Sequence, residues 1–176
     1  MSLELLSADI TRLEVDAIVN AANTNLLAGG GVCGAIFRAA GFGELQAACN
    51  KLAPIQTGEA VITPGFNLPA KFIIHTAGPI YHDGKHGEPA LLRSCYTNSL
   101  KRAVEHNLHS VAFPLISSGI YGYPANAAML IAFTAIRDFL ATHDDLEVIL
   151  TVINSHFIDE FKAVARQLGY VTEATI

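Results

Sequence analysis

NAANTNLLAGGGVCGAIFRAAGFG, residues 20–43, joins an apolar strand to a helix through two asparagines and three consecutive glycines. Glycines let the backbone approach a ligand closely, and the first turn of the following helix offers unpaired N–H groups and a partial positive charge. The stretch therefore predicts a cradle for an anion. For the triplet Gly29-Gly30-Gly31 taken alone, a glycine-rich strand-to-helix connection without a ligand is the alternative.

A second loop of this kind, SSGIYGYP at residues 117–124, also follows an apolar strand and precedes a helix. Ligands of open α/β sheets bind outside the carboxyl ends of the strands, so two such loops predict a cleft that holds a diphosphate from both sides. The backbone N–H groups of Gly119, Ile120 and Tyr121 are the expected donors. The ring of Tyr121 can stack on a sugar while its hydroxyl stays in water. An ordinary core aromatic is the alternative for Tyr121.

Runs of β-branched residues alternate with longer amphipathic stretches, which predicts an α/β domain. The turn residues of 64–69 predict an antiparallel strand pair, and hence a mixed sheet. The expected strands are Leu3–Ser7, Ala17–Asn20, Gly58–Thr63, Lys71–Ala77, Ser110–Pro114 and Glu147–Ile153. The expected helices are Cys33–Ala40, Phe42–Leu52, Glu88–His106, Asn126–Thr142 and Ile158–Leu168.

Length and composition fit one domain over residues 1–176, because 176 residues of which 51% are hydrophobic can bury their own core. The apolar runs are too short to span a membrane, and the first residues lack the basic region of a signal peptide. We therefore expect a soluble cytoplasmic protein. A net charge of −5 without a dense Lys/Arg run argues against binding to a nucleic-acid backbone, so an anion should be held by backbone N–H groups.

The cysteines Cys33, Cys49 and Cys95 are odd in number and form no C-x-x-C motif, which indicates free thiols rather than a disulfide framework or a zinc site. His106, His109, His143 and His156 show no metal-ligand spacing, and His82 and His86 flank Asp83-Gly84-Lys85, which is typical of a solvated loop, so no metal and no cofactor is expected. His75 lies within an apolar strand and is expected to pack beside the sheet. The loop 81–88 is expected to limit how large a substrate can reach the cleft.

Several short motifs together resemble the macro domain family over essentially the whole chain. They are Asp9-Ile10-Thr11, DAIVNAAN at 16–23, GGGVCGAI at 29–36 with RAAG at 38–41, TGEA at 57–60, IHTAGP at 74–79 and SGIYGYP at 118–124. The resemblance implies a three-layer α/β/α sandwich with a mixed central sheet and an ADP-ribose cleft. By itself, Asp9 is more typical of a turn or a helix cap.

The resemblance also implies roles for individual residues. Asp9 and the N–H of Ile10 would read the adenine, Asn23 would hydrogen-bond the distal ribose, and Tyr121 would pack against that ribose. Asn20 would brace the loop from inside the cleft. Asn154 would border the adenine or its ribose, although an asparagine in a turn is common. The diphosphate would lie between the backbones of Gly30, Gly31 and Val32 and those of Ser117, Ser118, Gly119, Ile120 and Tyr121.

Cys33 decides the chemistry. The hydrolase branch that the chain most resembles usually carries Asp at this position and often His at that of Phe37, and a thiol cannot replace a carboxylate directly. Related viral macro domains carry a non-acidic residue there and are still credited with removing ADP-ribose from carboxylate side chains, the substrate itself activating the water.

The first hypothesis is therefore an ADP-ribosyl ester hydrolase acting on O-acetyl-ADP-ribose or on mono-ADP-ribosylated acidic side chains. Asn23 and Cys33 are its candidate catalytic residues. Asn23 would align the reactants, and a second route would use Cys33 as a nucleophile. The alternative is a non-catalytic module that reads ADP-ribose. Under either hypothesis the partner is ADP-ribose or an ADP-ribosyl derivative, including an ADP-ribosylated protein.

Overall fold

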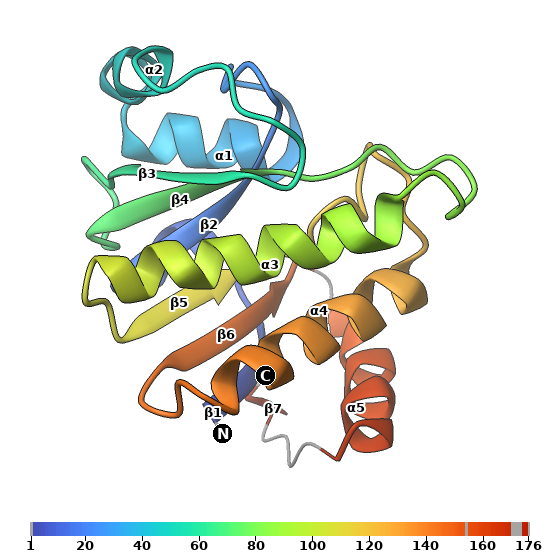
Figure 1. The fold of residues 1–176 in the computed structure, drawn as a ribbon. Coiled ribbons are helices and arrows are strands. Elements are labelled where there is room, and N and C mark those ends of the chain that lie inside the picture. The colour runs from blue at the N-terminus through green and yellow to red at the C-terminus, as the bar shows by residue number, and fades with distance from the viewer. Residues whose placement is uncertain (1, 154, 170–173, 176) are drawn as a thin grey trace.

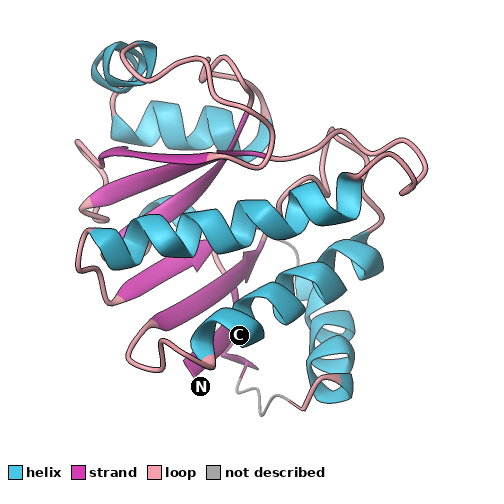
Figure 2. Cartoon of the chain, viewed as in Figure 1, coloured by secondary structure: helices cyan, strands magenta, loops and turns pink. Residues whose placement is uncertain are grey.

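The structure, a computed structural model, describes residues 2–153, 155–169 and 174–175 (Figures 1 and 2). Strands and helices alternate along most of the chain, as an α/β fold requires. The strands are β1 (Ser2–Ser7), β2 (Ala17–Ala22), β3 (Ala60–Pro64), β4 (Phe72–Ala77), β5 (Ser110–Phe113), β6 (Glu147–Val152) and β7 (Ala174–Thr175). The helices are α1 (Gly31–Ala40), α2 (Phe42–Asn50), α3 (Glu88–Glu105), α4 (Ala125–Leu140) and α5 (Ile158–Gln167), with short 3-10 turns η1 (Ile10–Arg12) and η2 (Ser155–Phe157).

The strands form one sheet in the order β3-β4-β2-β5-β6-β1-β7. Strand β3 runs antiparallel to its neighbour β4, and the other described pairs are parallel. The predicted mixed sheet and the antiparallel pair are confirmed. Because β1, β2, β4, β5 and β6 run in the same direction, the loops that follow them all emerge at one edge of the sheet.

Side chains of the central strand β2 alternate between two cores. Ala17 and Val19 face a core shared with α3, α4 and α5, whereas Ile18 and Ala22 face a core shared with α1 and α2. This alternation is the period of two that a strand buried on both faces must show. Helices therefore cover both faces of the sheet, which confirms the three-layer sandwich (Figure 1).

Each of the six strands and five helices expected from the sequence is present, and the ends agree within two residues. The sequence analysis missed β7 and the turns η1 and η2, which are two or three residues long and too short for a periodic pattern. None of the helices in the described residues is both long and apolar enough to cross a membrane.

Candidate functional site

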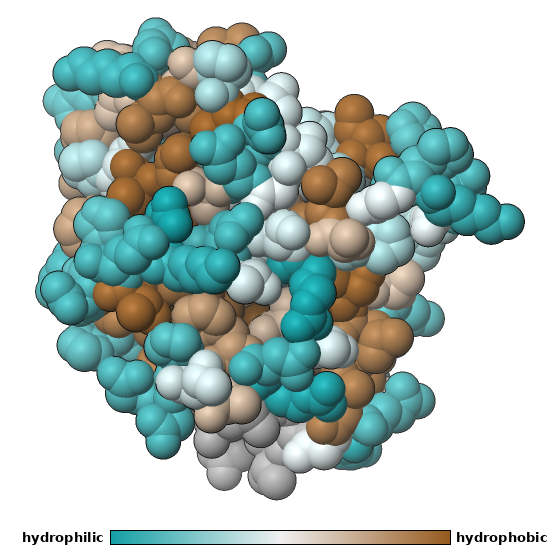
Figure 3. Space-filling model, viewed as in Figure 1, coloured by the Kyte–Doolittle hydropathy of each residue, from teal (hydrophilic) through white to brown (hydrophobic). Residues whose placement is uncertain are grey.

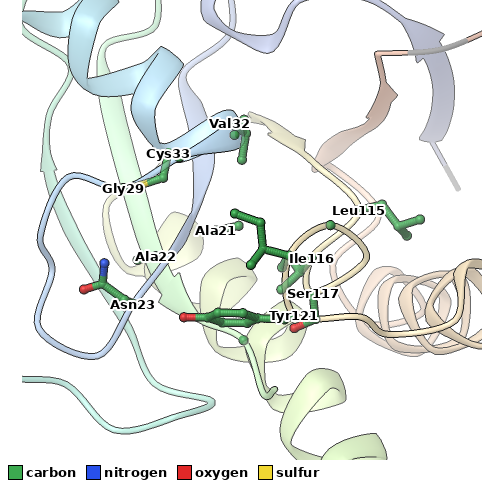
Figure 4. A pocket seen from close by; sticks show the side chains of 15 residues that line it. Ala21, Ala22, Asn23, Gly29, Val32, Cys33, Leu115, Ile116, Ser117 and Tyr121 are labelled. Atoms are coloured by element: carbon green, nitrogen blue, oxygen red, sulfur yellow. The ribbon is translucent and has the colours of Figure 1, made fainter. Parts of the chain in front are cut away.

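A cleft of about 290 Å³ opens at the carboxyl edge of the sheet, between the loop after β2 and the loop after β5 (Figure 4). Its lining, taken over the residues that the structure describes, includes no charged side chain. The lining residues are Ala21, Ala22, Asn23, Gly29, Gly30, Gly31, Val32, Cys33, Gly78, Leu115, Ile116, Ser117, Gly119, Ile120 and Tyr121. The structure thus brings together the two loops that the sequence analysis placed opposite each other.

One wall of the cleft is the N-terminus of α1. Gly30 is the N-cap, and the first intrahelical bond runs from the N–H of Gly34 to the Gly30 carbonyl at 3.3 Å. The N–H groups of the preceding first-turn residues therefore lack helical partners and point toward the cleft end of the helix. Of the glycine triplet only Gly31 has a positive φ, 58°. Gly34 allows close packing, because a Cβ there would lie 2.5 Å from the Gly29 carbonyl oxygen.

The opposite wall is the tight loop after β5. Ser117 has a φ of 66°, and its carbonyl accepts a bond from the N–H of Tyr123 at 2.9 Å. The Gly119 carbonyl accepts a second bond from Gly122 at 3.0 Å. Within the described chain, the N–H groups of Gly119, Ile120 and Tyr121 have no hydrogen-bond partner. Two sets of free N–H donors thus face one uncharged cleft, an arrangement suited to an anion.

Tyr121 and Ser117 give this wall its side-chain chemistry. Tyr121 is partly exposed and lines the cleft, so it is not a core aromatic, and Figure 4 shows its hydroxyl directed toward the side on which Asn23 lies. Ser117 is only 6% exposed, and its Oγ has no partner within the described residues. A buried hydroxyl without a partner is costly, so Ser117 offers a hydrogen bond to whatever occupies the cleft.

Asn23 is held by the backbone of its own loop. Its Nδ2 donates to the Leu27 carbonyl at 2.8 Å, and its Oδ1 accepts from the Leu27 N–H at 3.0 Å. A side-chain amide has two donors and two acceptor lone pairs, so one of each remains free. Asn23 therefore presents an oriented donor and acceptor pair at the end of the cleft.

Cys33 lies at the base of the cleft and is backed by a buried polar cluster. Its Sγ accepts from Asn20 Nδ2 at 3.7 Å and donates to the Leu27 carbonyl at 3.8 Å. Asn20 also meets His75 Nδ1 at 3.1 Å, and His75 Nε2 meets Thr63 Oγ1 at 2.9 Å. Asn20 is 1% exposed and so braces Cys33 from behind the cleft wall instead of facing a ligand. The sequence analysis expected Asn20 to brace the loop from inside the cleft; Asn20 does brace it, but from behind the wall, and Asn20 is not among the lining residues.

The cluster behind Cys33 is neutral. Burial lowers the pKa of His75 to about 4, and burial raises the pKa of Cys49 to about 11, with a smaller contribution from nearby Cys33. His75 is packed beside the sheet, as its sequence context predicted. Because Asn20 stands between Cys33 and His75, no imidazole of the described residues touches the Cys33 thiol to remove its proton.

Three further predicted site residues, Asp9, Ile10 and Ser118, are not among the residues that line the cleft. Asp9 is exposed and caps η1, accepting bonds from the N–H of Thr11 at 3.0 Å and from its hydroxyl at 2.7 Å, which also lower the pKa of Asp9. Ile10 is buried beside α1. Ser118 turns its Oγ into its own loop, bonding the Leu115 carbonyl at 2.7 Å. Asn154 lies outside the described residues.

Sequence reasoning did not assign Gly78, Leu115 or Ile116 to the site, although all three line the cleft. Gly78 has a clear reason to be glycine, since a Cβ there would clash with Ser117 Oγ. The motif IHTAGP was a signal for this position. The contact itself joins residues far apart in the chain and is visible only in three dimensions.

Two carboxylates and one imidazole, from Asp83, Glu88 and His86, have candidate ligand atoms within 4.8 Å of one another. The Glu88 carboxylate already accepts N–H bonds from His82, Asp83, Gly84 and His86, at distances between 2.6 and 3.2 Å. Burial would raise the pKa of Glu88, but these bonds outweigh it and hold the pKa far below its usual range. Glu88 therefore anchors the loop around it rather than binding a cation.

The fold and the sequence match known proteins. The solved structure of an Oceanobacillus iheyensis macrodomain mutant with ADPR superposes with a TM-score of 0.90 at 40% identity, covering 94% of this chain and 92% of that one. The O-acetyl-ADP-ribose deacetylase of Escherichia fergusonii is 52% identical over 145 residues, 80% of this chain and 81% of that protein. The ADP-ribose glycohydrolase MACROD1 of Bos taurus is 53% identical over 148 residues, 81% of this chain and 44% of that protein.

The family model described as Macro domain matches residues 19–132. That range includes most of β2, both cleft loops and half of α4, so it covers every residue that lines the cleft. On the match of this model and the identity to these relatives, the chain belongs to the macro domain family.

Proposed function

We propose that this chain binds ADP-ribose in the cleft and hydrolyses ADP-ribosyl esters. The observation that carries the binding step is the pair of facing N–H sets, from the first turn of α1 and from Gly119, Ile120 and Tyr121, with no charged side chain among the described lining residues. Backbone dipoles of this kind stabilise a diphosphate without a metal or a lysine. The names of two relatives, a glycohydrolase and a deacetylase, support the hydrolytic step.

The sheet order supports a direction for the ligand. Strands β4, β2, β5, β6 and β1 end side by side, so their loops line the edge in that sequence. Asp9 follows β1, the two N–H walls follow β5 and β2, and Gly78 follows β4. The adenine would lie toward β1, the diphosphate between β5 and β2, and the distal ribose near Asn23 and Tyr121 toward β4.

In hydrolysis, water adds to the acyl carbon, the bond from that carbon to the ribose oxygen breaks, and the products are a carboxylic acid and ADP-ribose. Asn23 positions the reacting ribose through its free amide donor and acceptor, which Leu27 holds in place. Positioning of this kind contributes on the order of several kcal/mol to a barrier. Cys33 is not the nucleophile in this proposal, because its thiol is bonded inward, to Asn20 and the Leu27 carbonyl, and neither is a base.

A reader without turnover is the second candidate function. It is favoured by one observation, the Cys33 thiol at the base of a cleft whose described lining holds no ionised side chain. A carboxylate could accept a proton from water, whereas a thiol is a weak hydrogen-bonding group. Under this alternative the cleft binds ADP-ribose, but the protein does not hydrolyse ADP-ribosyl esters at a useful rate.

The test pairs calorimetric titration with ADP-ribose and mass-spectrometric detection of released ADP-ribose or acetate. The substrates are a glutamate-modified protein and O-acetyl-ADP-ribose, and the proteins are wild type, Cys33→Ala and Cys33→Asp. Binding with turnover that survives in Cys33→Ala supports the hydrolase and excludes the thiol as nucleophile. Binding without turnover, with activity appearing in Cys33→Asp, supports the reader. Absence of binding would refute both.

A further inference from the structure

An open groove of about 740 Å³ adjoins the cleft on the side of β4. Gly78 and Tyr121 line both, so the cleft and the groove lie on either side of these two residues. The other wall of the groove comes from the loop that joins β4 to α3, which projects from the side of the molecule as a largely hydrophilic arm (Figures 1 and 3). The proposed placement of ADP-ribose uses the cleft alone and leaves this groove free.

The groove is preformed. The β4–α3 loop wraps four N–H groups around the Glu88 carboxylate, which is 2% exposed. The N–H of Tyr81 also donates to the Tyr121 carbonyl at 2.9 Å, which ties this loop to the N–H wall of the cleft. A wall fixed in this way loses little conformational freedom when a ligand binds, which favours affinity.

The lining of the groove is mixed and, over the described residues, carries no Lys or Arg. Ile80 is 56% exposed and provides an apolar contact, Thr24 and Thr57 offer hydroxyl groups, and the rings of His82 and His86 lie 6.2 Å apart. Aliphatic, hydroxyl and imidazole groups suit a polypeptide, whose main chain and side chains need both kinds of contact. A phosphate backbone would require clustered cations, and a chain with a net charge of −5 does not supply them here.

We propose that this groove binds the acceptor polypeptide of an ADP-ribosylated protein, on either side of the modified residue. The proposal rests on the proposed function, because it needs the distal ribose to lie beside Tyr121. A group joined to that ribose would then leave the cleft across Gly78 and Tyr121 and enter the groove. A volume of about 740 Å³ is that of a site for a drug-sized ligand and far exceeds the need of an acetyl group.

The test measures binding, so that it does not depend on turnover. Calorimetry compares ADP-ribose with a peptide that carries ADP-ribose through a hydrolysis-resistant amide linkage. We expect wild type to bind the modified peptide about tenfold more tightly than ADP-ribose. Ile80→Ser and His82→Ala should each raise the Kd for the modified peptide about threefold and leave the Kd for ADP-ribose unchanged. His82 anchors Glu88 through its backbone N–H, so the alanine variant keeps the loop.

Leu130→Ser is the matched control, since Leu130 is 45% exposed on α4 and lines neither the cleft nor the groove. It should bind both ligands as wild type does. Equal affinity of wild type for peptide and ADP-ribose, or an excess that survives in both groove variants, would overturn the groove proposal and leave the ADP-ribose cleft standing. Tighter binding of an ADP-ribosylated oligonucleotide than of the peptide would overturn it as well. Failure to bind ADP-ribose at all would refute the proposed function itself.

Discussion

Asn23 and Leu27 form a closed pair, in which Nδ2 of Asn23 donates to the Leu27 carbonyl at 2.8 Å and Oδ1 accepts from the Leu27 N–H at 3.0 Å. The same carbonyl is the acceptor for the Cys33 thiol at 3.8 Å. The two candidate catalytic side chains are thus fixed to one backbone position. A change at Asn23 should therefore disturb the cleft loop as well as the ligand contact.

Asn23→Asp keeps the size of the side chain and removes its donor. The carboxylate would face the Leu27 carbonyl and add a negative charge beside the proposed diphosphate site, which disfavours an anionic ligand. We expect the Kd for ADP-ribose to rise by about 100-fold, measured by calorimetry. Asn25→Ala, an exposed change in the same loop, should leave that Kd unchanged. A Kd within about twofold of wild type for Asn23→Asp would contradict the assigned contact.

Gly34→Ala tests the close packing of α1 on the cleft loop. The new Cβ would lie 2.5 Å from the backbone oxygen of Gly29, so the loop must move. We expect the free energy of unfolding to fall by about 1–3 kcal/mol in urea titration, together with weaker ADP-ribose binding. Gly43→Ala, in α2 with no atom within 4 Å of its new Cβ, should be neutral or stabilise by up to about 1 kcal/mol. Equal effects of the two variants would contradict the argument.

The sequence was sufficient to predict the sheet, the helices and the two cleft loops, because strand and helix periodicities and glycine-rich turns are local signals. It predicted that the strand ends at Asn20, but β2 continues to Ala22, and Asn20 contacts Cys33 of α1 and His75 of β4. Because this buried contact joins three elements, no local pattern of residues could place it. The contact of Gly78 with Ser117 depends on tertiary packing and leaves no pattern in the chain. The bonds that fold the loop around Glu88 are local, but an irregular loop has no periodic pattern that would predict them.

Ser117→Ala separates ligand binding from stability. The Oγ of Ser117 is buried without a partner among the described residues, so removing it costs the unliganded protein no hydrogen bond there. We expect the free energy of unfolding to stay the same or rise by up to about 1 kcal/mol. The affinity for ADP-ribose should fall by about tenfold, because a buried hydrogen bond to the ligand is lost. A loss of stability with unchanged affinity would show that Ser117 acts only within the protein.

Glu88→Gln tests the anchor of the β4–α3 loop. The amide NH2 group would meet the N–H groups that now donate to the carboxylate, so at least one hydrogen bond is lost. Because the pKa of Glu88 is lowered on folding, its ionised form stabilises the protein above the ordinary carboxyl pKa, and this stability is lost as the pH falls below it. We expect a lower thermal midpoint at about pH 7 and a smaller difference from wild type at about pH 3. Glu105→Gln, at an exposed ion pair with Arg102, should leave the midpoint nearly unchanged.

His75 should give the protein a pH-dependent stability in mildly acidic solution. Its folded pKa of about 4 lies below the ordinary value of 6.5. Between these two pH values His75 therefore binds a proton in the unfolded chain and stays neutral in the folded chain. Stability is therefore complete above pH 6.5 and declines as the pH falls toward 4, by roughly 3 kcal/mol over that window. Urea titrations between about pH 7 and about pH 4.5 measure this slope. His75→Gln should flatten it, whereas the exposed change His109→Gln should not, and a slope that persists in His75→Gln would assign the proton to another group.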